Sequence, residues 1–186
     1  ILDKANYWSL KRDKVTESEI LALSNARRSL KEYRDLRLKQ IETVQYLKYD
    51  ALQKNVHGVL SFLSNNFSLY MVTLRRLRAS LMWELDFFHI RQYFKDVLSS
   101  YDEEIPKWKI KWSLINDYFG EKFEENSIIV GDTETDIRAG QELGFRTIAV
   151  LSGIRNEIKI TDANPDMIVD GIWSLPQVIL PKTKLL

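Results

Sequence analysis

The chain has 186 residues, 45% of them hydrophobic, with a formal net charge of +1 and no cysteine. This length suffices for one domain, or one domain with a modest insertion. The near-zero charge gives no global field that favours nucleic acid, and the lack of cysteine excludes disulfides, a thiol nucleophile and cysteine-bound zinc. We find no signal peptide and no apolar run of the roughly 18 residues that a membrane span needs, so we expect a cytoplasmic protein.

Glycine and proline divide the chain into two parts. All four prolines lie at Pro106 or later, and Gly58 is the only glycine before Gly120. Because these residues mark turns, the first half is predicted to be mostly helical and the second half to alternate strands with helices.

The first predicted helices cover residues 16–52. Thr16 and Glu19 have the spacing of a capping box, and apolar residues recur from Ile20 at intervals of three and four. The basic stretch 27–39 is most simply a solvated helix face. The alternative is a small helical cap whose arginine or lysine side chains meet an anionic substrate.

A helix over residues 56–63 and a strand over 67–73, apolar enough to be buried on both faces, come next. The strand ends at Thr73, whose hydroxyl is well placed to donate a hydrogen bond to a phosphoryl oxygen. The alternative is a threonine present for its β propensity. A helix-rich piece over 81–94 and a short strand over 96–100 follow.

After Pro106, a helix carries three lysines at its start. The helix phase favours Lys107 as the one that faces a charged site, with Lys111 second and Lys109 third. An ammonium group there would neutralise crowded carboxylate and phosphate groups. The alternative for each is a solvated surface lysine.

The most informative stretch is 127–140. An apolar run ends in Gly131 and Asp132, and a helical pattern with Asp136 resumes at once, which predicts a buried strand that delivers acids to its carboxyl end. Two carboxylates held close together need a cation, and Mg²⁺ takes such oxygen ligands. A turn aspartate followed by a helix-capping aspartate is the alternative. Strands over 145–151 and 167–169 and a closing helix from Ile172 complete the pattern.

This block, with its continuation Ala139–Arg155, resembles the last motif of the haloacid-dehalogenase-like (HAD) hydrolases, in the phosphoglycolate phosphatase and beta-phosphoglucomutase branch with a helical cap. The resemblance implies that Asp132 is a metal ligand and that Asp136 assists it. It also implies that Thr73 and a lysine, Lys107 or alternatively Lys111, bind phosphate and act in catalysis. The chain departs from the family pattern after Thr73, where asparagine is usual, and lacks the Pro-x-Pro that commonly follows the lysine.

The resemblance also bears on the start of the chain. Ile1, Leu2 and Asp3 look like the piece that trails the family's first strand. The nucleophilic aspartate, the acid/base aspartate and the third metal contact are therefore expected before Ile1.

Together these observations predict an α/β fold: a doubly wound, Rossmann-like parallel sheet with a small helical cap, the core comprising 1–10 and 55–186 and the cap 11–54. The implied activity is Mg²⁺-dependent hydrolysis of a small phosphorylated metabolite through an aspartyl-phosphate intermediate. We expect a monomer or homodimer that binds neither nucleic acid nor membrane.

Three alternatives remain. The first is a non-catalytic relative that binds a phosphorylated ligand or a protein partner. The second is nucleic-acid binding by the basic stretch 27–39, which salt would weaken. The third, within the same fold, is a phosphomutase or dehalogenase.

Overall fold

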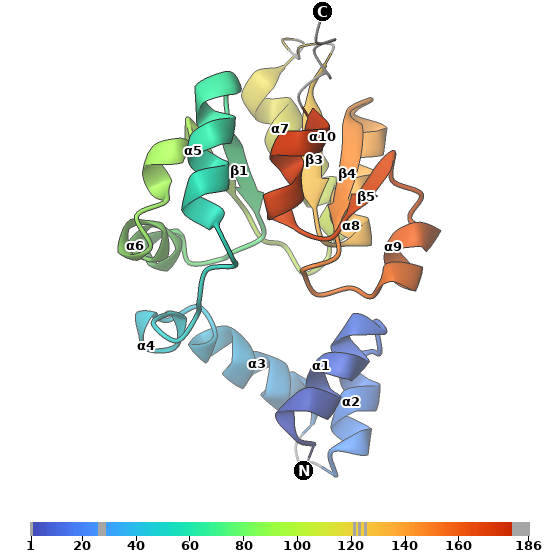
Figure 1. Cartoon of the computed structure of the whole chain (residues 1–186). Coiled ribbons are helices and arrows are strands. Elements are labelled where there is room, and N and C mark those ends of the chain that lie inside the picture. The colour runs from blue at the N-terminus through green and yellow to red at the C-terminus, as the bar shows by residue number, and fades with distance from the viewer. Residues whose placement is uncertain (1, 26–28, 121, 123, 125, 180–186) are drawn as a thin grey trace, which may run out of the picture.

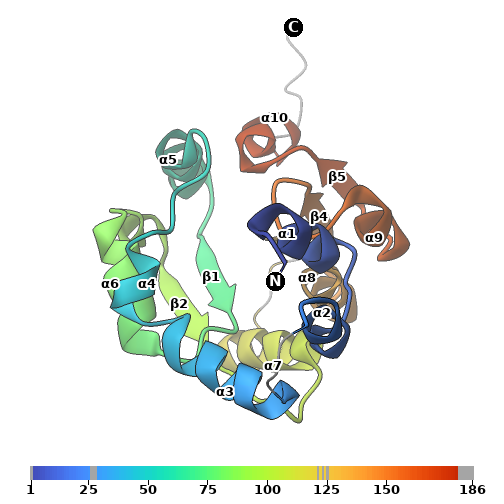
Figure 2. The same ribbon diagram turned by 90° about the horizontal axis from the view of Figure 1, so that it is seen from below.

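The computed structural model describes residues 2–25, 29–120, 122, 124 and 126–179. Four helices form a helical part that lies at the carboxyl ends of the strands (Figures 1 and 2). They are α1 (Lys4–Arg12), α2 (Glu17–Leu23), α3 (Leu30–Gln40) and α4 (Val44–Leu47). We call α1 to α4 the helical part throughout.

Local capping explains where two of these helices begin. The Glu19 side chain accepts a hydrogen bond from the Thr16 amide at 2.9 Å, and Thr16 Oγ1 accepts one from the Glu19 amide at 3.3 Å. Ser29 and Glu32 repeat the arrangement at the start of α3. The capping box predicted at Thr16 is thus confirmed.

The rest of the chain alternates helices and strands. Its elements are α5 (Val56–Asn66), β1 (Tyr70–Thr73), α6 (Arg78–Phe87), η1 (Arg91–Tyr93), β2 (Asp96–Ser99), α7 (Lys107–Phe119), β3 (Ile128–Gly131), α8 (Glu134–Glu142), β4 (Arg146–Val150), α9 (Glu157–Asp162), β5 (Met167–Val169), η2 (Ile172–Ser174) and α10 (Leu175–Ile179).

All strand pairs in the described part of the chain are parallel. β1 pairs with β2, and β3, β4 and β5 form a separate sheet in that order. The predicted doubly wound α/β class is confirmed, although the described strands form two sheets rather than one. Among them, β1, β2, β3 and β5 each have one edge without a partner strand.

Helices on both faces join the two sheets. On one face, α5 contributes Val56 to a core cluster with α6 and β2, and Val59 and Leu63 to a cluster with Ile148 of β4. On the other face, α7 contacts β1 and β2 and packs against α8. Ile137, on the inner side of α8, is fully buried. The two sheets therefore share one folded core.

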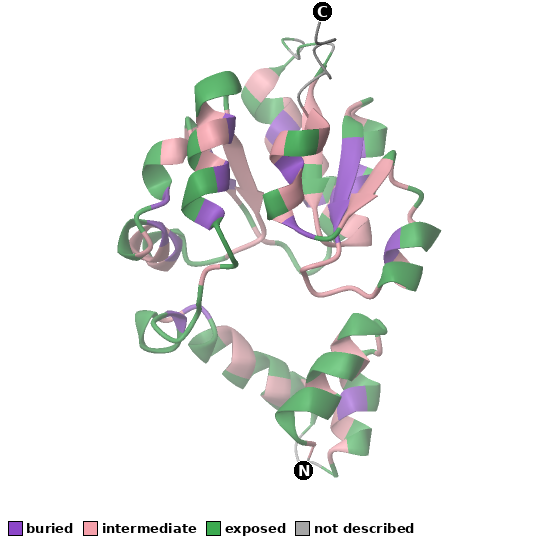
Figure 3. Ribbon diagram, in the orientation of Figure 1, coloured by how far each residue is buried: buried purple, intermediate pink, exposed green. Residues whose placement is uncertain are grey.

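Two strands are less buried than predicted (Figure 3). All four residues of β1 are half-buried, and Val130 in β3 is 37% exposed. The prediction that these strands are buried was wrong: no residue of β1 or β3 is buried, whereas the neighbouring β2, also an edge strand, buries Val97 and Leu98. The predicted tail from Pro181 lies outside the described residues, and no described helix is long and apolar enough to cross a membrane.

Candidate active site

The predicted acids lie where β3 gives way to α8. Gly131 ends the strand, and a Cβ at this position would overlap the side chain of Asp136. Glycine therefore lets the Asp136 carboxyl group fold back against the end of the strand. This approach places both predicted acids, Asp132 and Asp136, at the carboxyl end of a parallel sheet, which is the usual location of sites in open α/β folds.

Asp136 is buried and fully engaged. One carboxylate oxygen accepts from Lys111 Nζ in an ion pair. The other accepts from Thr133 Oγ1 at 2.7 Å and from the Thr133 amide at 3.2 Å. Because a buried carboxylate needs a cation and hydrogen bonds, Lys111 and Thr133 together account for its burial.

Asp132 is half-buried and differently placed. Its Oδ2 accepts a hydrogen bond from the Ile154 amide at 2.8 Å. No described residue forms a hydrogen bond or ion pair with its other oxygen. Asp132 is therefore the carboxylate with an oxygen available to a further ligand.

The lysines of α7 point to different surroundings. Lys111 is largely buried against Asp136, whereas Lys107 and Lys109 are exposed. Lys107 lies near Lys11 and affects its ionisation. Burial lowers the pKa of Lys11, and Glu17 opposes this effect. Nearby cations, which include Lys107, lower the pKa of Lys11 further. Of the three lysines that the sequence singled out, the structure brings only Lys111 to the acids.

Thr73 lies at the end of β1, in the other sheet. It lines a cavity of about 390 Å³ between the chain after α4, β1 and α6. Arg75 and Glu84 also line this cavity, together with the apolar residues Leu52, Met71, Leu81, Leu85, Phe88 and Ile90. Thr73 and Asp132 share no hydrogen bond or ion pair among the described residues. Helix α7 contacts β1 and packs against α8, so it links the parts of the fold in which the two strand ends lie.

An acid from the helical part fixes the loop after Thr73. Glu42 is buried, and its Oε2 accepts hydrogen bonds from the amides of Arg76 and Leu77, both at 2.7 Å. These amides precede α6, whose own N-cap residue makes no side-chain capping bond. Glu42 thus caps α6 from a distance and ties the helical part to the Thr73 loop.

A second acid beside this cavity has an altered ionisation. Burial raises the pKa of Glu84 to about 7; Arg75 opposes this effect, while Asp50 and Glu42 add to it. Arg75 Nη2 lies 3.5 Å from Glu84 and 3.8 Å from Asp50. Glu84 and Asp50 therefore share the positive charge of Arg75.

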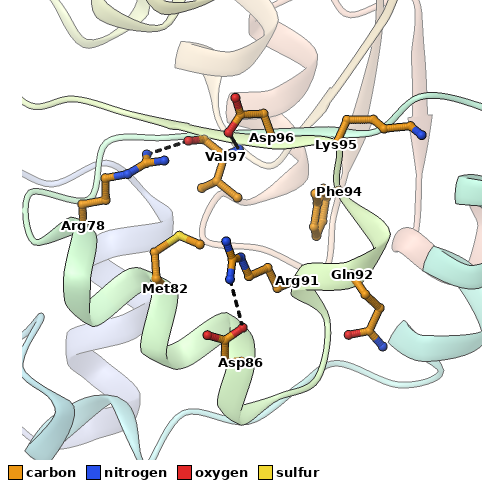
Figure 4. Close-up of a pocket in the computed structure, with 9 residues that line it drawn as sticks. All are labelled: Arg78, Met82, Asp86, Arg91, Gln92, Phe94, Lys95, Asp96 and Val97. Atoms are coloured by element: carbon orange, nitrogen blue, oxygen red, sulfur yellow. Dashed lines mark hydrogen bonds and ion pairs between the residues drawn. The ribbon is translucent and has the colours of Figure 1, made fainter.

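A further cavity, of about 420 Å³, lies beside β2 (Figure 4). Arg78 donates to the Val97 carbonyl at 2.7 Å on one side, and Arg91 lies 3.9 Å from Asp86 on another. None of the predicted site residues lines it, so it is separate from the acids at β3.

The donor set at β3 is compatible with Mg²⁺ held by few protein ligands. No group of three or more histidine or acidic side chains in the described residues is arranged around a common metal position. Mg²⁺ nevertheless needs only one or two protein carboxylates beside water and phosphate oxygens. The free oxygen of Asp132 meets that requirement, while Lys111 neutralises Asp136.

Sequence reasoning missed three contributors: Glu42, Arg155 and the Ile154 amide. Arg155 donates to Glu134 at 2.8 Å and to the Lys11 carbonyl at 2.8 Å. Gly153, directly after an apolar strand, is a local signal for a close approach at this point. Glu42 has no local signal, since its partners lie 34 and 35 residues away.

The fold and the site define a doubly wound α/β protein with carboxylates, lysine and threonine at the carboxyl ends of parallel strands. A model of the HAD-hydrolase-like family matches residues 100–175, which include α7, β3 and α8. The resemblance to the HAD-like hydrolases is thereby confirmed. No curated protein sequence matches the chain.

Solved structures share the fold over most of the chain. A predicted phosphatase from Clostridium acetobutylicum has a TM-score of 0.68 at 17% identity, covering 86% of this chain and 74% of that one. A proposed beta-phosphoglucomutase from Thermotoga maritima has a TM-score of 0.66 at 13% identity, covering 96% and 83%. The proposed HAD-hydrolase YfnB from Bacillus subtilis, bound to magnesium, has a TM-score of 0.63 at 17% identity, covering 97% and 86%.

Proposed function

We propose that the protein is a cytoplasmic, Mg²⁺-dependent phosphatase that hydrolyses a small phosphomonoester through an aspartyl-phosphate intermediate. The observation that carries the proposal is the Asp132, Asp136 and Lys111 group at the carboxyl end of β3. The HAD-like match over the same residues and the magnesium bound to YfnB support it.

In this proposal the attacking carboxylate belongs to chain that precedes Ile1. Among the described strands, β1, β2, β3 and β5 each have one edge without a partner, and we assign the strand that carries the nucleophile to the edges of β1 and β3. A parallel strand between them would satisfy both edges, and its carboxyl end would lie between Thr73 and Asp132. That is where a nucleophile would have to meet a phosphoryl group bound by these residues.

The reaction comprises two displacements at phosphorus. The attacking carboxylate oxygen forms a bond to phosphorus as the bond to the substrate's alcohol oxygen breaks, and this oxygen takes a proton from the acid/base aspartate that is expected before Ile1. Water then displaces the carboxylate, which regenerates the enzyme and releases inorganic phosphate. In this second displacement the attacking water returns a proton to that aspartate. When bound, Mg²⁺ neutralises charge on the phosphoryl oxygens.

The residues of this chain bind and orient the metal and the phosphoryl group. Asp132 would hold the metal through the oxygen that has no partner among the described residues. Thr73 donates its hydroxyl hydrogen to a phosphoryl oxygen, and Lys111 forms an ion pair with Asp136 and adds positive charge near the phosphoryl group. Lys107, at the exposed start of α7, is assigned a smaller contribution to this positive charge than Lys111.

Hydrolysis of p-nitrophenyl phosphate by the natural protein, with its N-terminus established by intact mass, tests the proposal. We expect EDTA to abolish activity, and Asp132→Asn or Lys111→Met to lower kcat by roughly 100-fold, as for loss of one electrostatic group. Lys107→Met is the matched control and should retain most of the activity.

Activity that is indifferent to EDTA and to Asp132→Asn would refute the mechanism. A natural protein that begins at Ile1 and binds inorganic phosphate without turnover would instead favour the non-catalytic alternative.

A further inference from the structure

The chain segment that follows β4, residues 151–156, contacts both Asp132 and the helical part. At its start, Ser152 Oγ donates to Gln53 Oε1 at 2.8 Å, in the connection from the helical part to α5. At its end, Asn156 Nδ2 donates to Asp13 Oδ1 at 2.5 Å, in the turn between α1 and α2. The 151–156 segment therefore lies between the site and the helical part.

In the middle of this segment the backbone approaches Asp132 closely. The Ile154 amide donates to Asp132 Oδ2 at 2.8 Å. A Cβ on Gly153 would overlap the Asp132 carboxyl group, so no larger residue allows this approach without a shift. The orientation of the Asp132 carboxylate thus depends on the backbone position at 153 and 154.

Arg155 fixes that backbone position. Its side chain is only 16% exposed, and its guanidinium donates to Glu134 at 2.8 Å and to the Lys11 carbonyl at 2.8 Å. Lys14 Nζ also lies 3.0 Å from Glu134. One guanidinium therefore bridges α8, which follows Asp132, and the end of α1, and its planar fork suits such a bridge.

The helices at the other end of this bridge are linked to one another. Glu17 of α2 lies 2.9 Å from Arg37 and 3.1 Å from Arg34 of α3, and 3.9 Å from Lys11 of α1. A displacement of α1 to α3 would consequently carry the Lys11 carbonyl and the Lys14 ammonium with it.

We propose that Arg155 is a positioning residue for Asp132, and that the 151–156 segment couples the position of the helical part to the orientation of the Asp132 carboxylate. The catalytic meaning of this coupling rests on the proposed function, because there Asp132 holds the metal. The coupling itself is a property of the contacts and exists without metal or substrate.

Coupling of this kind is reciprocal. If the position of the helices affects the hydrogen bond between Ile154 and Asp132, then loss of that bond must affect the position of the helices by the same free energy. If Arg155 only stabilised the fold, loss of the hydrogen bond between Ile154 and Asp132 would not have to change the position of the helices. Reciprocity therefore provides the test.

The experiment uses two readouts in metal-free protein. Hydrogen exchange of the Ile154 amide, measured by NMR, reports the bond to Asp132. Because the chain has no cysteine, Lys31→Cys in α3 with Ser61→Cys in α5 gives one spin-label pair, whose distance distribution reports the position of the helical part.

We expect Arg155→Met to speed Ile154 exchange about ten-fold and to broaden the distance distribution, and Arg155→Lys to do both less strongly. Asp132→Ala should also broaden the distribution, although Asp132 forms no hydrogen bond or ion pair with the described residues of the helical part. Arg91→Met, which removes an arginine paired with Asp86 at 3.9 Å far from the site, is the control and should change neither readout.

Unchanged Ile154 exchange in Arg155→Met, or an unchanged distribution in Asp132→Ala, would overturn the inference. If Arg155→Met does not fold, Ser152→Ala and Asn156→Ala test the same coupling through single hydrogen bonds. Failure of the phosphatase assay with reciprocal coupling intact would refute the proposed function alone.

Discussion

At the scale of single residues, the structure distinguishes acids by their surroundings. Asp136 is ion-paired, one oxygen of Asp132 has no partner among the described residues, and Glu84 is half-buried beside a shared arginine. Three carboxyl groups therefore lie in three different surroundings. The sequence shows the same functional group in each case, and only the tertiary neighbours separate them.

Glu84 gives a pH-dependent stability. Its pKa is raised from an ordinary value of 4.5 to about 7, mainly by burial. Because the folded state holds this proton more tightly than the unfolded state, the contribution to stability is full below about pH 4.5 and is lost as the pH rises through 7. We expect the free energy of unfolding to fall over this range in the natural protein and to fall less in Glu84→Gln.

Urea unfolding at pH 5, 6, 7 and 8 measures this difference. Glu142→Gln, at an exposed position on α8 whose ion pair with Arg138 spans 3.7 Å, is the control and should keep the natural pH profile. If the free energy of unfolding changed equally with pH in Glu84→Gln and in the natural protein, this would contradict the raised pKa assigned to Glu84.

At the scale of elements, α1, α2 and α3 are held by charge more than by apolar contact. Among their described residues only Ile20 is buried, whereas Glu17 accepts from cations of both neighbouring helices (Figure 3). Burial opposes ionisation of Glu17, but its bonds to Arg34, Arg37 and Lys11 lower its pKa. Its contribution therefore has the opposite sign to that of Glu84, and is lost as the pH falls below the ordinary value.

We expect Glu17→Gln to loosen these three helices and leave β4 unaffected. The charge-assisted bonds of Glu17 contribute about 1–2 kcal/mol, and partial exposure reduces this contribution. Their loss should speed amide hydrogen exchange roughly ten-fold in α2 and α3. Asp35→Asn, an exposed acid of α3 with no recorded partner among the described residues, is the control. Uniform acceleration in both the helices and β4 would show that Glu17 stabilises the whole fold instead.

At the scale of the whole molecule, the strand edges that lack a partner among the described strands, those of β1, β2, β3 and β5, matter for association. Such edges are templates for pairing with another chain. We expect the 186-residue chain to associate at high concentration, and Val130→Lys in β3 to reduce this association. Sedimentation velocity across a concentration series measures it.

The variant Ile158→Lys distinguishes association by strand pairing from nonspecific association through exposed apolar surface. Ile158 is an apolar residue on α9 and is 70% exposed. If Ile158→Lys reduces association as much as Val130→Lys does, apolar surface rather than the strand edge is responsible.

Much of the fold was predictable because its signals are local. The spacing of Asp132 and Asp136 after an apolar run, the last strand over 167–169 and the capping box at Thr16 all depend on residues within a few positions of one another. The choice of Lys111 over Lys107 depends on the rotation of α7, which the burial of Ile110 and Ile115 fixes only in the folded chain.

The contacts of Glu42 and Arg155 could not be predicted for a related reason. Their partners lie 21 to 144 residues away, and no periodic pattern marks either side chain. The division into two described sheets also depends on long-range pairing. Sequence reasoning therefore located the strand ends well and the connections between them poorly.

The sparse apolar contact among α1 to α3 has a consequence for the solutions in which the protein is handled. Ion pairs at partly exposed positions weaken as dissolved ions screen them, whereas an apolar core does not. Raising sodium chloride from tens of millimolar to about 1 M should therefore release these helices while the strands and α5 stay folded. High ionic strength would uncover the strand ends without denaturing the protein.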